Sequence, residues 1–511
     1  MPNVLPVSLA QLQQFADNIA LEDGYQQLSY RHVAQQVLQL SHWLNTQGYQ
    51  RIAICGPNSV AWVIADLAVA QANKICVPIP VFFSALQQHH ILQEANIQLL
   101  LFTEHHYAGK PTPIAGLWYQ IRPAQEDNTP QLPITSGKIT FTSGTTASPK
   151  GVCLSWQQQA STCEALTAAL QAQFVQPHYL HFCLLPLATL LENQAGIYVP
   201  LRLGQRILIL APSSTGLNGS ASLDINRFAQ SLLHYQPASL ILTPQLLHAL
   251  IILCSRYPTL AQSFTFIAVG GAHCAPGLLA RAAQIGLPVF QGYGLSEAGS
   301  VVALNLPQQQ SAGSVGKPLP HISIKLVEQH IWLKGDLFAG YLGEPQRDPE
   351  QWLDTGDLGA IDADGYLYIT GRSKHQLISS YGRNISPEWL EAELQLCPAV
   401  AQAMVTGDAK PWLSALVSLR PHATAQELTA QIQQLNSQLP DYARIRSVLL
   451  LTQPFSTDNH HLTDNGRLRR SQINHDYADV VELLYTNEPD GLTPTITLVT
   501  RNEELSHDHI F

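Results

Sequence analysis

A run of small hydroxyl-bearing residues around a glycine, followed by a lysine, is the stretch of this sequence best suited to chemistry. The run comprises Thr142, Ser143, Gly144, Thr145, Thr146 and then Lys150. Backbone N–H groups, hydroxyl donors and a mobile ammonium group together suit the binding of phosphate. The same residue types also dominate ordinary exposed turns, and the Walker pattern G-x-x-x-x-G-K-[ST] is absent. This stretch by itself leaves both interpretations open.

Two other stretches place glycines and polar residues directly after apolar runs that are typical of strands. One is Gly270-Gly271-Ala272, and the other is Gln291-Gly292-Tyr293-Gly294-Leu295-Ser296-Glu297. In open α/β sheets, ligands bind beyond the carboxyl ends of the strands. Tyr293 could stack on a flat ring, or it could be a turn aromatic packed on the core. Glu297 could bind Mg²⁺ as a hard oxygen ligand, or it could be a carboxylate favoured by a helix N-terminus.

A fourth stretch lies in a β-rich part that begins near residue 322. Asp357 ends the sequence Asp-Thr-Gly-Asp, where it could accept hydrogen bonds from a ribose diol or serve only as a turn residue. Further on, the sequence Thr-Gly-Arg-Ser-Lys at residues 370–374 combines a glycine with charge and is typical of a domain boundary. We therefore expect the polar stretches to belong to the part of the chain before this boundary.

The elements that must position these residues alternate between strands and helices, which predicts a mostly parallel sheet with helices on its faces. Helices are expected at 31–46, 58–72, 157–173, 225–235, 245–254 and 277–284, and strands at 51–55, 75–79, 181–187, 238–242, 265–269 and 288–290. Asn58 or Ser59 is expected to cap the second helix. Residues 111–133 are expected to be a connector. A small unit then follows, with helices at 387–396 and 425–436 and strands at 401–405 and 412–418.

The composition predicts a soluble protein of several domains. The chain has 511 residues, 46% hydrophobic and 13% charged, with a net charge of −10 and no basic block that would indicate nucleic acid or an anionic membrane. The eight scattered cysteines are expected to be free, buried thiols in a reducing compartment. We find neither a secretory signal nor an apolar run long enough to span a membrane, and therefore expect a cytoplasmic location.

The order of these stretches resembles the AMP-forming acyl and adenylate-forming ligases, from about residue 28 to residue 470. Residues 142–151 are similar to the phosphate loop T-S-G-T-T-G-x-P-K-G of that family, and residues 291–297 are similar to its G-Y-G-x-T-E block. Asp357 matches the aspartate of the T-G-D motif, and Arg372 matches a nucleotide-contacting arginine. Residues 381–387, which include Gly382, resemble the loop used when a thiol attacks the adenylate.

The resemblance implies an α/β fold with a large N-terminal domain of layered α/β subdomains and a small β-barrel-like part. A small, mobile α+β domain would follow. The implied boundaries are residues 1–372 for ATP and acyl binding, 373–486 for the mobile domain turning near Lys374, and 487–511 for a tail of unknown role. The tail could be one edge strand with a disordered end, or a contact for a neighbouring protein.

The implied reaction has two steps. A carboxylate attacks the α-phosphate of ATP·Mg²⁺ to give an acyl-adenylate and pyrophosphate, and a thiol then displaces AMP. The thiol would be CoA or the phosphopantetheine of an acyl carrier protein, and the sequence does not distinguish them. The resemblance assigns catalysis to Thr145, Glu297, Arg372 and Arg467, and Mg²⁺ to Thr145 and Glu297. It assigns nucleotide binding to 142–146, Lys150, 270–272, 291–294, Ser296, Asp357, Arg372 and Gly382.

Four positions depart from the family pattern. Ala147 replaces a glycine in the loop, Ser296 replaces a threonine, and Thr189 stands near a position where many acyl ligases have histidine. At Arg467 the family motif N-G-K-x-x-R has lysine, which serves adenylate formation. Arginine keeps the charge but differs in geometry and hydration. The alternative to an active ligase is therefore a weakened nucleotide- or acyl-binding protein of the same fold, although Arg383 is a second cation that could compensate.

The substrate prediction rests on the stretch 184–191. Amino-acid-activating members usually have an aspartate near residue 188, whereas this stretch carries no charge. An uncharged wall favours a fatty or other apolar carboxylic acid. Core packing would explain the same leucines equally well.

Overall fold

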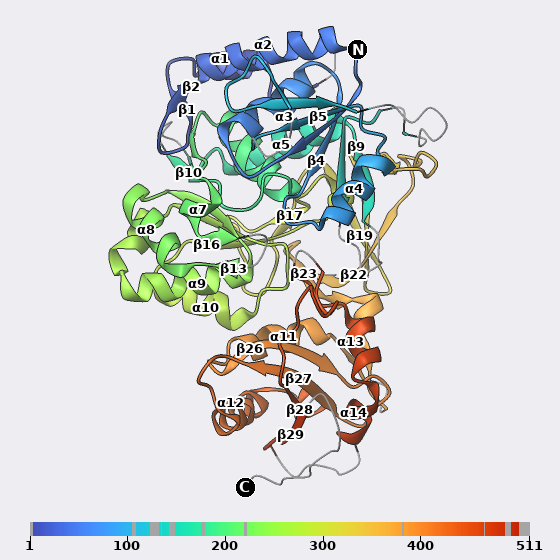
Figure 1. Ribbon diagram of the computed structural model, residues 1–511. Helices are drawn as coiled ribbons and strands as arrows, with labels where there is room; N and C mark the ends of the chain where they lie inside the picture. Colours follow the sequence, from blue (N-terminus) through green and yellow to red (C-terminus); the bar gives the residue numbers. More distant parts are fainter. Residues whose placement is uncertain are drawn as a thin grey trace.

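The computed structural model describes residues 4–104, 109–122, 132–133, 135–142, 149–174, 179–218, 222–380, 383–463, 466–485 and 492–499. Figure 1 shows a large N-terminal part that contains two extended sheets, and a smaller C-terminal part, coloured orange to red, at one end of it. The predicted α/β fold class, with a large domain followed by a small one, is confirmed.

The first large sheet has eight strands in the order β21-β9-β8-β4-β3-β5-β7-β6. Its parallel centre is β8 (Lys138–Thr142), β4 (Ile75–Ile79), β3 (Arg51–Cys55) and β5 (Leu99–Phe102). These strands are buried along nearly their whole length, as expected where helices cover both faces. The helices of this region are α1 (Leu9–Gln14), α2 (Tyr30–Gln47), α3 (Val60–Gln71), α4 (Ala85–Glu94) and α5 (Trp156–Leu170). Ser59, one of the two predicted caps, caps α3.

The expected connector at 111–133 is partly wrong. It contains β7 (Trp118–Ile121), which pairs antiparallel with β5 and with β6 (Lys110–Pro111). Both strands are largely exposed at the edge of the sheet, so their sequence lacks the continuous apolar run of a central strand. At the opposite edge, β9 (Lys150–Leu154) and β21 (Gly340–Tyr341) pair antiparallel.

The second large sheet has nine strands in the order β18-β17-β16-β15-β14-β10-β11-β1-β2. Its strands are β1 (Ile19–Glu22), β2 (Gln27–Ser29), β10 (Leu180–Phe182), β11 (Arg206–Leu208), β14 (Ser239–Leu242), β15 (Phe266–Val269), β16 (Val289–Tyr293), β17 (Ala303–Leu304) and β18 (Lys317–Pro318). The six strands from β16 to β1 run parallel. The surrounding helices include α6 (Val199–Arg202), α7 (Pro212–Thr215), α8 (Ile225–Tyr235), α9 (Pro244–Arg256) and α10 (Pro276–Gln284), and β12 (Leu217–Asn218) and β13 (Ser222–Leu223) form a separate pair.

A π-helix follows the expected strand at 181–187, of which only the first residues belong to β10. This π-helix, η1 (Glu192–Tyr198), is almost wholly buried and continues into α6. The apolar residues of 184–191 are divided among three hydrophobic cores, so they have a packing role. π-helices are rare and often lie at functional sites.

The β-rich part expected from residue 322 is an antiparallel sheet in the order β19-β20-β22-β23. Its strands are β19 (Ile322–Val327), β20 (His330–Gly335), β22 (Leu353–Ile361) and β23 (Leu367–Arg372). The last pair sets Asp357 opposite Arg372.

The C-terminal part is built on the sheet β26-β27-β28-β29. Its strands are β26 (Val400–Thr406), β27 (Leu413–Leu419), β28 (Ile445–Leu451) and β29 (Thr495–Val499). The helices of this part are α11 (Pro387–Gln395), α12 (Ala425–Gln438), α13 (Arg470–Asp476) and α14 (Ala478–Leu483). A separate pair is formed by β24 (Leu377–Ile378) and β25 (Asn384–Ile385). The tail thus contributes an edge strand, since β29 pairs parallel with β28. Asn436 links β28 to the segment before β29, because its side-chain amide donates to the carbonyls of Ile445 and Leu492.

Each part of the molecule has its own hydrophobic cores. Two cores draw their buried residues only from 385–484, and four draw theirs only from 7–367. All eight cysteines are free and buried. Among the described helices, none combines the length and apolar character needed to cross a membrane.

Candidate functional site

Tyr293, Asp357 and Arg372 form one hydrogen-bonded group, although they come from β16, β22 and β23. The Tyr293 hydroxyl donates to Asp357 Oδ2 over 2.6 Å, and Arg372 Nε lies 2.9 Å from Asp357 Oδ1. The Asp357 carboxylate is buried, whereas about half of the Arg372 side chain is exposed. A carboxylate has about four acceptor positions, so these two bonds leave capacity for another donor.

Arg467 reaches this group from the C-terminal part. Its Nη2 donates to the carbonyl oxygen of Gly271 over 3.4 Å. Desolvation of its guanidinium, followed by repulsion from Arg372, lowers the pKa of Arg467, while attraction to Asp357 acts in the opposite direction. The residue nevertheless remains exposed to solvent. Two cations and one carboxylate therefore meet where the two parts of the molecule face each other.

The electrostatics of Tyr293 follow from the same arrangement. Burial, and then the charge of Asp357, raise the pKa of the Tyr293 phenol well above its usual value, and Arg372 opposes the shift. Tyr293 therefore remains a neutral donor to Asp357 at neutral pH.

Two glycines in the predicted stretches are required by local geometry. A Cβ on Gly294 would lie 1.6 Å from the carbonyl oxygen of Ser300, so no other residue fits there. Gly271 has a φ of +79° and nothing within 4 Å of a Cβ position. The backbone of 270–272 consequently forms an open edge at the end of β15, beside Arg467.

Glu297 belongs to a second group, which lies beside the hairpin of β8 and β9. It sits in a short 3-10 turn, η3 (Ser296–Ala298), and its Oε1 accepts from the Tyr341 hydroxyl over 2.9 Å. Lys150 Nζ lies 5.1 Å from the centroid of the Tyr341 ring and 3.7 Å from Glu344 Oε1. Since Lys150 pairs with Thr142 across the hairpin, Glu297 faces the base of the Ser/Thr loop.

Several predicted residues lie outside the described part of the chain. These are Ser143, Gly144, Thr145 and Thr146 of the loop, the substitution Ala147, and Gly382. Gln291 and Gly292 lie in β16, and Ser296 begins η3. Arg383 lies over the ring of Tyr442, 5.9 Å from its centroid, and its described contacts include none with Arg467.

The connection between the two parts carries a charged network. Lys374 lies in the turn η4 (Ser373–His375) that follows β23, where Ser373 Oγ donates to the Gly356 carbonyl over 3.1 Å. His375 Nδ1 lies 2.5 Å from Glu388 Oε1, and Arg470 pairs with Glu391 on the same helix, α11. The segment that carries Arg467 is thereby tied to the connection itself.

The side chains around Glu297 suit a Mg²⁺ ion that is held mainly by a bound ligand and only partly by the protein. Within the described residues, no group of three or more His, Cys, Asp or Glu side chains is arranged to hold a metal ion. A single carboxylate suits Mg²⁺, because this ion keeps several waters and is usually held by one or two carboxylates together with the phosphates of a substrate. Glu297 therefore fits this ion.

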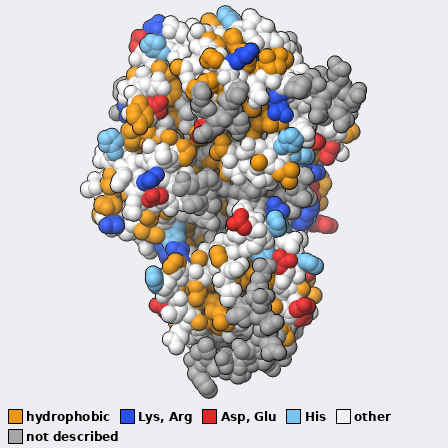
Figure 2. All heavy atoms as spheres, in the orientation of Figure 1, with side chains coloured by type: hydrophobic (Ala, Val, Ile, Leu, Met, Phe, Trp, Pro, Cys, Tyr) orange, Lys and Arg blue, Asp and Glu red, His pale blue; other side chains and the backbone are white. Residues whose placement is uncertain are grey.

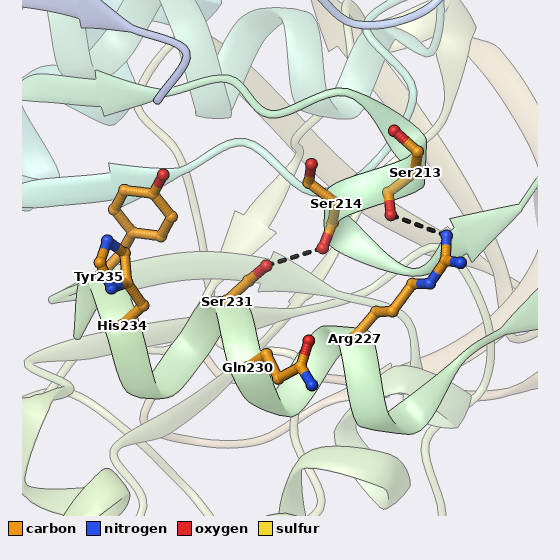
Figure 3. Close-up of a pocket in the computed structure, with 7 residues that line it drawn as sticks. All are labelled: Ser213, Ser214, Arg227, Gln230, Ser231, His234 and Tyr235. Carbon is orange, nitrogen blue, oxygen red and sulfur yellow. Dashed lines mark hydrogen bonds between the residues drawn. The ribbon is translucent and has the colours of Figure 1, made fainter. Parts of the chain in front are cut away.

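A shallow depression elsewhere on the surface does not have the features of a binding site. It lies between α7 and α8, and its polar side chains are partly used by neighbours: Ser231 Oγ donates to Ser214 O and Arg227 Nη1 donates to Ser213 O (Figure 3). It shares no residue with the groups around Asp357 and Glu297. On the face shown in Figure 2, Lys and Arg side chains are scattered among uncharged and acidic side chains.

Sequence reasoning missed Tyr341 and Glu344. Tyr341 is placed by the antiparallel pairing of β21 with β9, which joins residues far apart in the chain. A two-residue strand has no periodicity that would mark it in a sequence, so no local signal was available.

The chain is similar in sequence to two CoA ligases and in structure to a coenzyme A synthetase. A long-chain-fatty-acid–CoA ligase, FadD15 of Mycobacterium bovis, is 33% identical over 233 residues, which span 40% of this chain and only 39% of that protein. A 2-succinylbenzoate–CoA ligase of Enterococcus faecalis is 27% identical over 482 residues, covering 86% of this chain and 93% of the relative. The structure of O-succinylbenzoate coenzyme A synthetase (MenE) from Bacillus subtilis in complex with AMP superimposes with a TM-score of 0.71 at 22% identity, covering 91% of this chain and 97% of that chain.

Family profiles cover both parts of the molecule. The profile described as AMP-binding enzyme matches residues 9–336, more than half of the chain. The profile described as AMP-binding enzyme C-terminal domain matches residues 374–489. With its fold and the convergence of Tyr293, Asp357, Arg372 and Arg467, the chain belongs to the AMP-binding enzyme family.

Proposed function

We propose that this protein activates a carboxylic acid with ATP and transfers the acyl group to a thiol, releasing pyrophosphate and then AMP. The observation that carries the proposal is the meeting of Tyr293, Asp357 and Arg372 with Arg467, which arrives from the other part of the molecule. The relatives named above as CoA ligases support the same reaction class.

In this proposal the nucleotide lies along the carboxyl ends of β15 and β16. The Tyr293 ring stacks on adenine, and Asp357 accepts hydrogen bonds from the ribose hydroxyls. The exposed backbone of 270–272 borders the base. Thr142, Lys150 and the loop between them, which includes Thr145, hold the phosphates, and Glu297 with Thr145 holds Mg²⁺. When bound, Mg²⁺ supplies positive charge that offsets the charge of the phosphate oxygens.

Arg372 and Arg467 supply the remaining positive charge. Negative charge develops on the α-phosphate as the carboxylate oxygen attacks it, and the pyrophosphate leaves with the electron pair of the broken P–O bond. Fixed cations that await this charge lower the barrier because they need no reorganisation during the reaction. The two arginines repel each other in the absence of a ligand, so an anion between them relieves that repulsion.

We propose domain boundaries at 1–372 and 373–486, with residues 487–511 as a tail. Rotation near Lys374 would withdraw Arg467 and admit the thiol, which displaces AMP from the acyl-adenylate. CoA is the acceptor we favour, because the named relatives are CoA ligases. A fatty or other largely apolar acid is the substrate class we favour, since FadD15 is named as a long-chain-fatty-acid–CoA ligase. The stretch 184–191, although most of it packs in hydrophobic cores, also carries no charge that would favour a charged acid.

The decisive experiment is carboxylate-dependent exchange of labelled pyrophosphate into ATP with the full chain. The panel should run from acetate to long-chain fatty acids and include an aryl acid such as 2-succinylbenzoate and several amino acids. Exchange that depends on one class of acid would establish adenylation and identify that class.

Two variants sharpen the experiment. Arg467→Ala should abolish most of the exchange, and Arg31→Ala, which removes an exposed cation paired with Asp17, should not affect it. ATP binding without exchange for any acid would contradict the proposed activity and favour a nucleotide-binding protein. Equal exchange by Arg467→Ala and the unaltered protein would contradict the role of Arg467.

A further inference from the structure

Tyr341 contacts two side chains of opposite charge that the proposed function assigns to Mg²⁺ and to phosphate. Its hydroxyl donates to Glu297 Oε1 over 2.9 Å, and Lys150 Nζ lies 5.1 Å from the centroid of its ring. Glu297 belongs to η3 and Lys150 begins β9, so one side chain on β21 joins two elements that are distant in the chain. Because the hydroxyl makes one contact and the ring makes the other, substitution can separate them.

The backbone around Tyr341 is bonded to the same two elements. Phe338 N donates to the carbonyl of Glu297 over 2.7 Å, and Leu342 N donates to the carbonyl of Gly151 over 2.8 Å. The strand β21 between them pairs with β9. This segment therefore bridges η3 and β9 through its main chain, and Tyr341 repeats the connection with its side chain.

The turn that carries Tyr341 is closed by its own hydrogen bonds. Glu344 N donates to the carbonyl of Tyr341 over 3.1 Å, and Arg347 N donates to the carbonyl of Ala339 over 2.8 Å. The ring of Phe338 packs edge-on against the ring of Tyr341, with 4.9 Å between the centroids. A donor that packing and main-chain bonds hold in place can keep a carboxylate in one orientation.

Such a donor is important for a carboxylate that binds a metal ion. Mg²⁺ requires nearly ideal octahedral geometry, so the carboxylate oxygen must be presented in a defined direction. Carboxylates that bind metals are themselves hydrogen-bonded, and loss of the partner typically weakens metal binding by about 10–100-fold. Among the residues that the structure describes, the Tyr341 hydroxyl is the one hydrogen-bond donor to the Glu297 side chain.

The ring of Tyr341 acts on Lys150 through a weaker attraction. An ammonium group over an aromatic face is attracted to the ring electrons. Lys150 Nζ also lies 3.7 Å from Glu344 Oε1, but both of these side chains are more than half exposed, and such ion pairs contribute little. The ring and Glu344 together hold the ammonium group beside the hairpin from which the phosphate loop emerges.

We propose that Tyr341 is a positioning residue for the nucleotide, whose hydroxyl orients Glu297 toward Mg²⁺ and whose ring holds Lys150 for the phosphates. This inference rests on the proposed acid activation and assigns a further residue to the binding of its ATP. The two effects are unequal, because a hydrogen bond to a carboxylate is stronger than the attraction of an exposed ammonium group to a ring.

The test is calorimetric measurement of ATP binding to the full chain, once in EDTA and once in excess Mg²⁺. The factor by which Mg²⁺ tightens ATP binding reports on Glu297, and the affinity in EDTA reports on Lys150. Tyr341→Phe keeps the ring and removes the hydroxyl, so it should lose most of the Mg²⁺ factor and keep the affinity in EDTA. Tyr341→Leu should lose the same factor and also bind ATP about two- to fivefold more weakly in EDTA.

Tyr366 provides a matched control. Lys317 Nζ lies 4.8 Å from the centroid of its ring, which repeats the contact between Lys150 and Tyr341 at the turn between β22 and β23. Among the described residues, neither Glu297 nor Lys150 is a printed partner of Tyr366. Tyr366→Phe and Tyr366→Leu should therefore leave the Mg²⁺ factor and the affinity in EDTA unchanged.

A double-substitution cycle determines whether the hydroxyl acts through Glu297. Glu297→Gln should lose the Mg²⁺ factor by itself, and Tyr341→Phe in the same chain should then change it no further. Independent, additive losses would overturn the inference, because they would show that Tyr341 affects binding through the general stability of the fold. If Tyr341→Leu fails to fold, Tyr341→Phe and this cycle still decide the role of the hydroxyl.

The remaining outcomes separate this inference from the proposed function. Equal Mg²⁺ factors for Tyr341→Phe and the unaltered protein would overturn the inference and leave acid activation intact, since pyrophosphate exchange tests that activity separately. Absence of ATP binding under both conditions would remove both.

Discussion

Two groups of charged side chains in this molecule, one around Lys138 and one around Arg467, differ in how fully their charges and hydrogen bonds are paired. The Lys138 ammonium group is buried and fully paired. Its Nζ lies 2.7 Å from Asp66 Oδ1 and donates to Asn193 and Tyr198, and both Lys138 and Asp66 are 1% exposed. Around Arg467, the residues that the structure describes provide few bonds: its Nη2 donates to Gly271 O over 3.4 Å, and a second cation, Arg372, repels it.

The difference separates a structural role from a ligand-binding role. Lys138 begins β8, Asp66 lies on α3 and Tyr198 on η1, so the closed network joins elements of the two large sheets and has no capacity for a ligand. Arg372 and Arg467 have excess positive charge that only an anion would balance. We expect substitutions in the first group to change stability, and substitutions in the second to change activity.

The largest effect is expected for Lys138→Met. It leaves the Asp66 carboxylate buried without its cation, which should lower the free energy of unfolding by about 3–5 kcal/mol. Denaturant unfolding measures this change. Lys334→Met, which breaks an exposed pair with Glu350, should cost less than about 1 kcal/mol. Equal effects of the two substitutions would contradict the contrast between buried and open networks.

For Arg467→Ala we expect the activity to fall while the stability hardly changes. Loss of a preorganised cation should reduce pyrophosphate exchange by roughly 10²–10³-fold. Because a long hydrogen bond to Gly271 O is the one hydrogen bond that the side chain makes within the described parts of the chain, the unfolding midpoint should hardly change. Arg467→Lys, which keeps the charge, should exchange at a similar or higher rate. A strongly destabilised Arg467→Ala protein would show that this cation is structural after all.

The connection between the two parts should be sensitive to acid. Burial raises the pKa of Glu388, but the hydrogen bond to His375 and the charge of Arg470 outweigh it and hold the pKa at about 2. The unfolded carboxyl has a pKa of about 4.3, so this stabilisation is complete above that pH and is lost as the pH falls toward 2. After discounting for its partial exposure, about 2 kcal/mol is involved.

Unfolding of Glu388→Gln, followed between pH 6 and pH 2, should lack this component of the pH dependence. Glu350→Gln, at an exposed carboxyl paired with Lys334, is the control and should follow the unaltered protein. Parallel curves for Glu388→Gln and the unaltered protein would exclude a role for Glu388 in the connection.

The smallest effect is expected for Tyr293→Phe. The ring that would stack on adenine remains, and only the 2.6 Å bond to Asp357 is lost. A hydrogen bond of this kind contributes about 1–2 kcal/mol, so the KM for ATP should rise roughly tenfold with little change in kcat. Tyr293→Leu, which also removes the ring, should raise it further. No difference between Phe and Leu would contradict stacking.

The sequence by itself determined much of the local structure. Apolar periodicity predicted α2 and α9 to within a few residues, and Ser59 was one of two predicted caps of α3. The Tyr293, Asp357 and Arg372 motifs were recognisable because each is short and contiguous, and the predicted fold class is confirmed. Such features depend on neighbours within one turn or strand, which a sequence displays directly.

Only the tertiary structure decided which of these features meet. The bond from Tyr341 to Glu297 and the approach of Arg467 to Gly271 each join segments far apart in the chain. Glu192 and Asn193 are neighbouring buried polar residues, yet Asn193 bonds Lys138 and Asp66 whereas neither oxygen of Glu192 has a nitrogen or oxygen hydrogen-bond partner among the described residues, because each side chain faces a different element. Hydrogen-bond saturation depends on atoms brought within about 3 Å by folding, so no local pattern in the sequence could reveal it.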